Sequence, residues 1–162
     1  MVGPNAITGL ERIREMFSIF HDGEIALATV DGTELFMQVD IAYLAERIRP
    51  GMKSFRVRLT GVQALTLTTW PKDTALAPDH LTDPRLIFDP PLEILSCQVA
   101  DNRLEVACNQ DSPESSYCGG TLSLRAVVAT VTDEDGKLYS IDELAGLCDG
   151  YWTDWSKRHK QT

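Results

Sequence analysis

The chain has 162 residues and a net charge of −9, and 43% of its residues are hydrophobic. This length and apolar fraction exclude a wholly disordered chain and suffice for one domain with its own core. No apolar run approaches the roughly 20 residues that a membrane-spanning helix needs. The negative net charge disfavours direct contact with DNA or RNA, whose phosphates attract basic proteins. We therefore expect neither a membrane nor a nucleic acid as partner.

The first residues contain no basic stretch followed by an apolar one, so no secretory signal is visible. We expect a cytoplasmic protein in which the four cysteines are thiols. Their spacing lacks the close pairs typical of a structural zinc site, and no nucleotide-binding motif is present. The sequence thus predicts no metal and no cofactor. No segment resembles the motif of a known family.

In the first third of the chain, residues 9–16 have the apolar spacing of a short amphipathic helix. Residues 24–30 and 34–41 alternate between apolar and polar side chains. Asp31-Gly32 between them is typical of a two-residue hairpin turn. Residues 55–70 predict a second hairpin that turns at Gly61.

Residues 71–91 hold five of the eight prolines, so no regular strand should run through them. We expect Leu86, Ile87 and Phe88 to fix this segment to the core as an ordered cover. Beyond it, residues 92–108 predict a third hairpin.

The third hairpin should turn at Asp101-Asn102. That register places Cys97 opposite Val106 and Cys108 opposite Leu95, too far apart for a disulfide. Next, the β-branched run 121–131 predicts one long strand.

Ser140-Ile-Asp-Glu143 is a capping box, which typically begins a helix. The apolar stripe that follows predicts an amphipathic helix with Trp152 and Trp155 packed on the core. The predicted fold is α+β, mainly β: an antiparallel β-sandwich or partly open barrel of about eight strands with a C-terminal amphipathic helix. We assign residues 1–156 to a single globular domain and residues 157–162 to a basic tail.

The most nucleophile-like local sequence is Cys118-Gly119-Gly120, because glycines can free backbone amides to bind an oxyanion. If the protein were an enzyme with a dispersed site, His21 and His80 would be the candidate bases. The alternative is that the glycines form a bulge in a strand. The common hydrolase and nucleotide-enzyme motifs are absent, which favours a protein without catalytic activity.

The leading hypothesis is an acidic protein that binds a basic protein, for example an immunity protein that neutralises a bacterial toxin. The alternatives are a β-barrel-like domain with a small molecule inside it, covered by residues 71–91, and the dispersed-site enzyme. The candidate contact residues are carboxylates in turns and irregular segments: Asp22, Asp79, Asp83, Asp133, Glu134 and Asp135.

Overall fold

The computed structural model describes residues 3–159. It is an open antiparallel sheet with a long C-terminal helix, which confirms the α+β, mainly β prediction. The eight longer strands are β2 (Glu24–Asp31), β3 (Glu34–Asp40), β4 (Ser54–Thr60), β5 (Gln63–Pro71), β7 (Leu92–Ala100), β8 (Arg103–Asn109), β9 (Tyr117–Arg125) and β10 (Val128–Thr132). Three two-residue strands complete the sheet: β1 (Ile7–Thr8), β6 (His80–Leu81) and β11 (Leu138–Tyr139).

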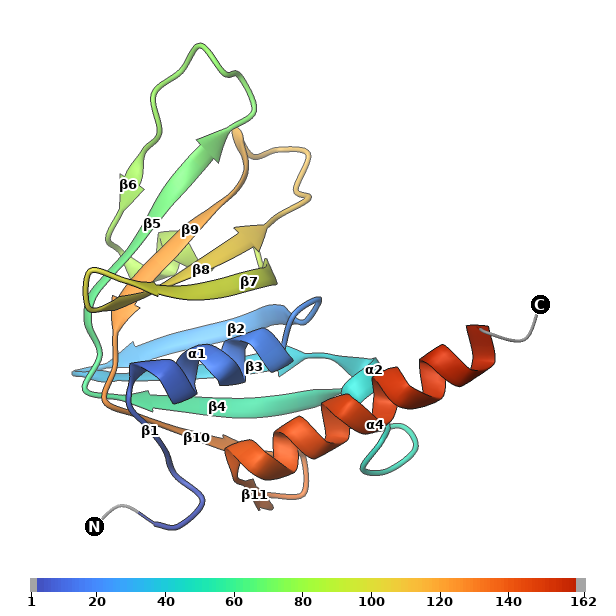
Figure 1. Cartoon of the computed structure of the whole chain (residues 1–162). Coiled ribbons are helices and arrows are strands. Elements are labelled where there is room, and N and C mark those ends of the chain that lie inside the picture. Colours follow the sequence, from blue (N-terminus) through green and yellow to red (C-terminus); the bar gives the residue numbers. More distant parts are fainter. Residues whose placement is uncertain (1–2, 160–162) are drawn as a thin grey trace.

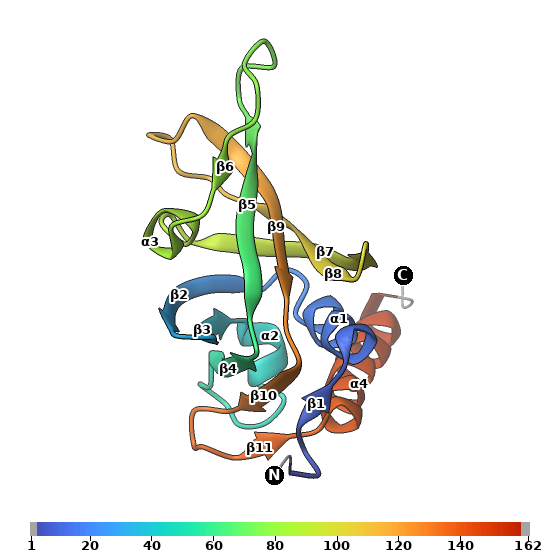
Figure 2. The same cartoon turned by 90° about the vertical axis from the view of Figure 1, so that its left-hand side faces the viewer.

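The strand order divides the sheet into two halves (Figure 1). The chain forms strands of the first half, then those of the second, and returns to the first with β10 and β11. One half contains β10, β4, β3 and β2, and the other contains β7, β8, β9, β5 and β6. In residues 3–159, β2 and β7 join the halves laterally through two residue pairs. Two chain crossings, from β4 to β5 and from β9 to β10, connect them further. Figure 2 shows the second half rising away from the first.

The helices are α1 (Leu10–Ile19), α2 (Ala42–Ala45), α3 (Pro84–Ile87) and α4 (Ile141–His159). α1 and α4 pack against each other on one side of the first half-sheet, and the short helix α3 contacts β2 at the edge of this half-sheet (Figures 1 and 2). Within residues 3–159, no helix is long and apolar enough to cross a membrane.

The core lies between the helices and the sheet because α1 turns one apolar side inward. Ile13, Met16 and Phe17 on this side are fully or almost fully buried. Phe20, just after the helix, packs against Phe55 of β4 with ring centroids 5.3 Å apart. One continuous cluster of buried side chains extends from here through both half-sheets.

Two local predictions of turns and caps are confirmed. Ser140 and Glu143 exchange hydrogen bonds of 3.1 Å between side chain and backbone at the start of α4. Asp101 and Asn102 both have positive φ angles, of 51° and 59°, as a tight two-residue turn between β7 and β8 requires.

The predicted hairpin through Gly61 is wrong. Gly61 does turn the chain, with a φ of 71°. β4, however, pairs with β3 and β10, and β5 pairs with β9 and β6. The chain leaves the first half-sheet at this turn and enters the second.

Two further strand predictions need correction. The single strand expected over residues 121–131 is divided into β9 and β10, which belong to different half-sheets. In the β7–β8 pair Cys97 does face Val106, but Cys108 faces Ile94, because a register shift falls between Ile94 and Ser96.

The packing predicted for the proline-rich segment holds in part. Ile87 and Phe88 are buried, as expected, whereas the Leu86 side chain is 56% exposed. The tryptophans predicted to pack on the core stay 36% (Trp152) and 39% (Trp155) exposed, because this half of α4 extends past the sheet (Figure 1). α4 also includes the first residues of the predicted basic tail, and the residues from Lys160 onward lie outside the described part.

Candidate functional site

The histidines predicted as possible bases lie in separate elements. His21 follows α1, where its Nδ1 donates to the Ser18 carbonyl oxygen at 2.8 Å and its ring stacks on Trp152 with a centroid distance of 5.8 Å. His80 lies on β6 at the far edge of the second half-sheet and contacts the Thr68 hydroxyl at 3.1 Å. Each imidazole is therefore held by local contacts.

Cys118 is exposed on β9, and its thiol donates to the Trp70 carbonyl oxygen at 3.5 Å. Within residues 3–159, no hydrogen bond joins this thiol to an imidazole. A Cβ added at Gly119 would lie 2.2 Å from the Cys108 carbonyl oxygen, and one at Gly120 would lie 2.6 Å from the Thr68 carbonyl oxygen. The close approach of neighbouring strands thus explains both glycines without an oxyanion site.

All four cysteines are free thiols. Burial raises the pKa of Cys97 and of Cys108 to about 12. Both thiols therefore stay protonated near neutral pH, which makes them poor nucleophiles and poor metal ligands. No group of three or more potential metal-ligating side chains occurs in the described part of the chain.

Asp133, one of the predicted contact residues, is 2% exposed at the turn between β10 and β11. Its carboxylate accepts hydrogen bonds from the Tyr139 hydroxyl at 2.7 Å and from the backbone amides of Asp135 and Lys137 at 2.8 and 3.0 Å. Burial alone would raise its pKa, but these hydrogen bonds stabilise the charged form and lower the pKa below its ordinary value. Asp133 thus stabilises the turn between β10 and β11.

The other predicted contact residues lie in four places. Glu134 and Asp135 follow in the same turn, where they contact the Lys53 amide and the Arg49 guanidinium. Asp83 caps α3 by accepting from an amide of that helix. Asp22 is exposed beside His21, and Asp79 is exposed just before β6. The six carboxylates do not form one surface.

The structure gathers a different set of carboxylates around the junction of the two half-sheets. They line two shallow hollows of about 240 and 410 Å³ that share Pro90 and Ser112. We call this surface the acidic face, and its residues are Glu24, Asp89, Glu93, Asp111 and Glu114.

The acidic face contains little opposing charge. Glu24 and Glu93 are directly opposite each other in the β2–β7 pair, an arrangement that is normally destabilising. Neither hollow is lined by Lys, Arg or His, and among residues 3–159 none of these five carboxylates takes part in an ion pair. The nearby ammonium of Lys72 bonds to the Ser112 carbonyl oxygen at 2.9 Å.

Apolar side chains stand among these charges. Leu81, Leu86 and Tyr117 line the larger hollow together with Asp89 and Glu114. Burial and the charge of Asp89 raise the pKa of Tyr117. The acidic face thus combines partly exposed apolar groups with unpaired negative charge.

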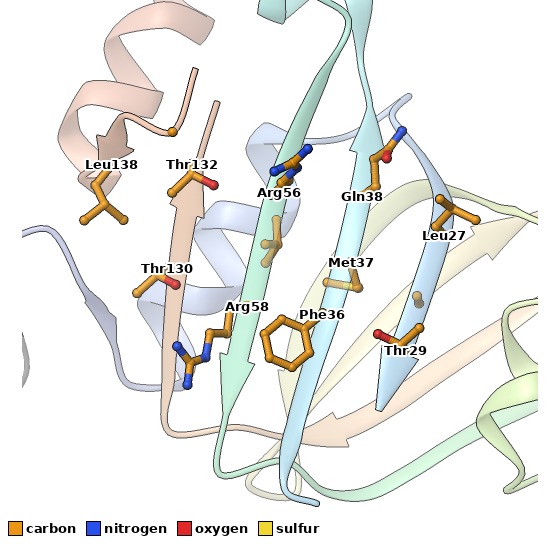
Figure 3. Close-up of a pocket in the computed structure, with 13 residues that line it drawn as sticks. Leu27, Thr29, Phe36, Met37, Gln38, Arg56, Arg58, Thr130, Thr132 and Leu138 are labelled. Atoms are coloured by element: carbon orange, nitrogen blue, oxygen red, sulfur yellow. The ribbon is translucent and has the colours of Figure 1, made fainter. Parts of the chain in front are cut away.

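A second surface lies on the side of the first half-sheet that faces away from α1 and α4. It carries an open hollow of about 750 Å³ (Figure 3). We call it the outer sheet face, and its outward side chains are Leu27, Thr29, Phe36, Gln38, Arg56, Arg58, Thr130, Thr132 and Leu138.

Aromatic rings cluster where α4 meets α2. Tyr43 packs against Tyr151 with centroids 4.5 Å apart, and Trp155 stacks on His159 at 4.0 Å. An ion pair of 2.6 Å between Arg47 and Asp154 lies beside them. The Tyr43–Tyr151 and Arg47–Asp154 contacts fasten α4 to the body of the protein, and the Trp155–His159 stack lies within α4 itself.

None of the five carboxylates of the acidic face was predicted from the sequence as a contact residue. These five carboxylates come from three separate stretches of the chain, and the β2–β7 pairing and the loops beside it bring them together. The sequence contains only a weak indication of the outer sheet face. Arg56 and Arg58 alternate with buried residues, and the exposed Phe36 lies opposite Arg58.

Comparison with known proteins gives no match: no family model fits the chain, and no curated protein or solved structure is significantly similar to it.

Proposed function

We propose that the protein has no catalytic activity of its own and binds a basic protein through the acidic face. The proposal rests on Glu24 and Glu93, which are opposite each other on β2 and β7 and form no ion pair among residues 3–159. A sheet gains nothing from like charges placed opposite each other. A lysine or arginine from a partner would supply the missing opposite charge.

The remaining features of the face support the same function. Interfaces combine a partly apolar centre with polar groups around it, as Leu81, Leu86 and Tyr117 do among the carboxylates. The net charge of −9 would also speed the encounter with a basic protein at low ionic strength. An immunity protein that neutralises a basic toxin is one kind of protein that would use such a surface.

Capture from an extract of the native host tests the proposal. The immobilised wild-type protein is compared with the variant Glu24→Gln/Glu93→Gln/Asp111→Asn. A control variant, Glu15→Gln/Asp31→Asn/Asp142→Asn, loses the same charge at exposed positions outside the acidic face.

We expect the wild type and the control to retain the same basic protein, and the acidic-face variant to lose it. The proposal is wrong if the retained protein is acidic, if the acidic-face variant retains it equally well, or if no basic protein is retained.

A further inference from the structure

The side chains of the outer sheet face form two rows that run across the strands (Figure 3). In strand register, the first row is Leu27, Gln38, Arg56, Thr132 and Leu138. This row has a leucine at each end and a guanidinium in the middle, with an amide on one side and a hydroxyl on the other.

The second row lies beside the first and is Thr29, Phe36, Arg58 and Thr130. The Arg58 guanidinium is already occupied: it pairs with Glu34 and lies over the Phe36 ring, 5.5 Å from the ring centroid. Its contacts hold the exposed Phe36 ring in place within the second row.

Arg56 differs from its neighbour. Among residues 3–159, its guanidinium forms neither a hydrogen bond nor an ion pair. Two carboxylates border the face, but Glu34 pairs with Arg58, and Asp40 accepts from the Gln38 amide at 2.9 Å. The centre of the face therefore offers one free positive charge in a protein that is strongly negative.

Exposed apolar side chains lie near this charge. The Leu27 side chain is 65% exposed, that of Leu138 is 45% exposed and that of Phe36 is 39% exposed. Leu27 and Phe36 are diagonal neighbours across β2 and β3 and together form one exposed apolar patch, a feature that favours a binding site. A ligand that fits would carry a negative head group and an apolar body.

The dimensions suit a small molecule better than a protein. The hollow of about 750 Å³ lies within the range of ligand pockets, roughly 300–1,000 Å³. It is lined by 13 residues, whereas a standard protein interface takes about 20–30 residues from each partner.

We propose that the outer sheet face binds a small amphipathic anion, with its head group on the Arg56 guanidinium and its apolar body against Leu27 and Phe36. The Gln38 amide and the Thr132 hydroxyl flank Arg56 in the same row and are placed to hydrogen-bond the head group. This site is separate from the acidic face and does not depend on the basic partner.

Calorimetric titration with dodecanoate, below the concentration at which it forms micelles, tests this proposal. Dodecyltrimethylammonium has the same chain with a positive head, and acetate has the head without the chain. The variants are Arg56→Gln, Leu27→Ser and, as control, Arg12→Gln, which removes an exposed guanidinium from α1 on the other side of the sheet. Urea unfolding of each variant verifies that it is folded.

We expect one dodecanoate to bind per chain, and Arg56→Gln to weaken this binding at least about tenfold through loss of a charge-assisted contact. Leu27→Ser should also weaken it, and Arg12→Gln should leave it unchanged. The ammonium analogue and acetate should each bind at least about tenfold more weakly than dodecanoate.

Several results would overturn the proposal. These are no binding of dodecanoate to the wild type, equal binding by Arg56→Gln and Arg12→Gln, or equal binding of the ammonium analogue, which would indicate apolar adhesion alone. Acetate binding as tightly as dodecanoate would reduce the site to a simple anion site. A protein that is captured through Leu27 while dodecanoate fails to bind would assign the face to a protein partner instead.

Discussion

Neutralising Glu24 should make the protein more stable while weakening its contact with the partner. Glu24 and Glu93 are directly opposite on β2 and β7, where Cβ atoms are about 4.5–5.5 Å apart. Two like charges 4 Å apart repel by about 1 kcal/mol in water. We therefore expect Glu24→Gln to raise the free energy of unfolding by about 0.5–1 kcal/mol. For a chain of this length that corresponds to roughly 1–4 °C in Tm.

Urea and thermal unfolding of the two single variants and the double variant measure this effect. Both variants relieve the Glu24–Glu93 repulsion, and Glu24→Gln also relieves the repulsion from Asp40, its partner on β3. The double variant should therefore gain little beyond Glu24→Gln alone. The gain should also shrink as the ionic strength rises towards about 1 M, where the Debye length falls to about 3 Å. A loss of stability in Glu24→Gln, or gains that add in full and do not respond to salt, would refute this account of the pair.

Three further predictions concern the scaffold. Asp133→Asn should lower the free energy of unfolding by about 2 kcal/mol at neutral pH. Because the folded-state pKa of Asp133 is lowered, the stabilisation by its carboxylate is complete above about pH 4 and is lost as the pH falls through that lowered pKa. A stability difference between Asp133→Asn and wild type that persists unchanged in acid would contradict this. Gly119→Ala should lower the free energy of unfolding by about 3 kcal/mol or more, because its Cβ would meet backbone atoms and its φ is 154°. Gly146→Ala, in open space on α4, should raise that free energy by up to about 1 kcal/mol, as measured by urea unfolding. Similar effects at both glycines would argue against the close approach of the strands at Gly119. A thiol reagent should modify the exposed Cys118 in the native protein and reach the buried Cys108, whose pKa is raised to about 12, only on unfolding; equal rates for the two thiols would contradict the burial of Cys108.

Features that depend on a few neighbouring residues could be predicted from the sequence. The capping box at Ser140 and the turn at Asp101-Asn102 are of this kind, because the groups that stabilise them lie within four residues of one another. The alternation in β3 and β4 also predicted correctly which side chains face the core.

Pairings between distant strands could not be predicted in this way. A turn at Gly61 between two apolar stretches is equally compatible with a hairpin and with a chain that moves to another part of the sheet. The decisive partner of β4 is β10, which is about 70 residues further along the chain. The division of residues 121–131 between two half-sheets has the same origin, since both parts of that run are individually good strands.

The candidate sites were harder to predict because they are properties of the surface. The sequence predicted that carboxylates would matter but selected those in turns, and the structure uses Asp133 of that group to hold a turn. Glu24 and Glu93 are about 70 residues apart in sequence and meet only through the short β2–β7 contact. Arg56 was indistinguishable from any other exposed strand residue until its neighbours across the sheet were known.

If the acidic face attracts a basic protein, the attraction should depend on salt. The most direct test is the association rate constant between the protein and the basic protein that it captures, measured by stopped-flow mixing at about 10 mM and about 150 mM ionic strength. We predict that the rate falls at least about tenfold over this range for the wild type and for Glu15→Gln/Asp31→Asn/Asp142→Asn. The rate of Glu24→Gln/Glu93→Gln/Asp111→Asn should be slow at both ionic strengths. A rate that is indifferent to salt, or that falls equally in both triple variants, would contradict the claim.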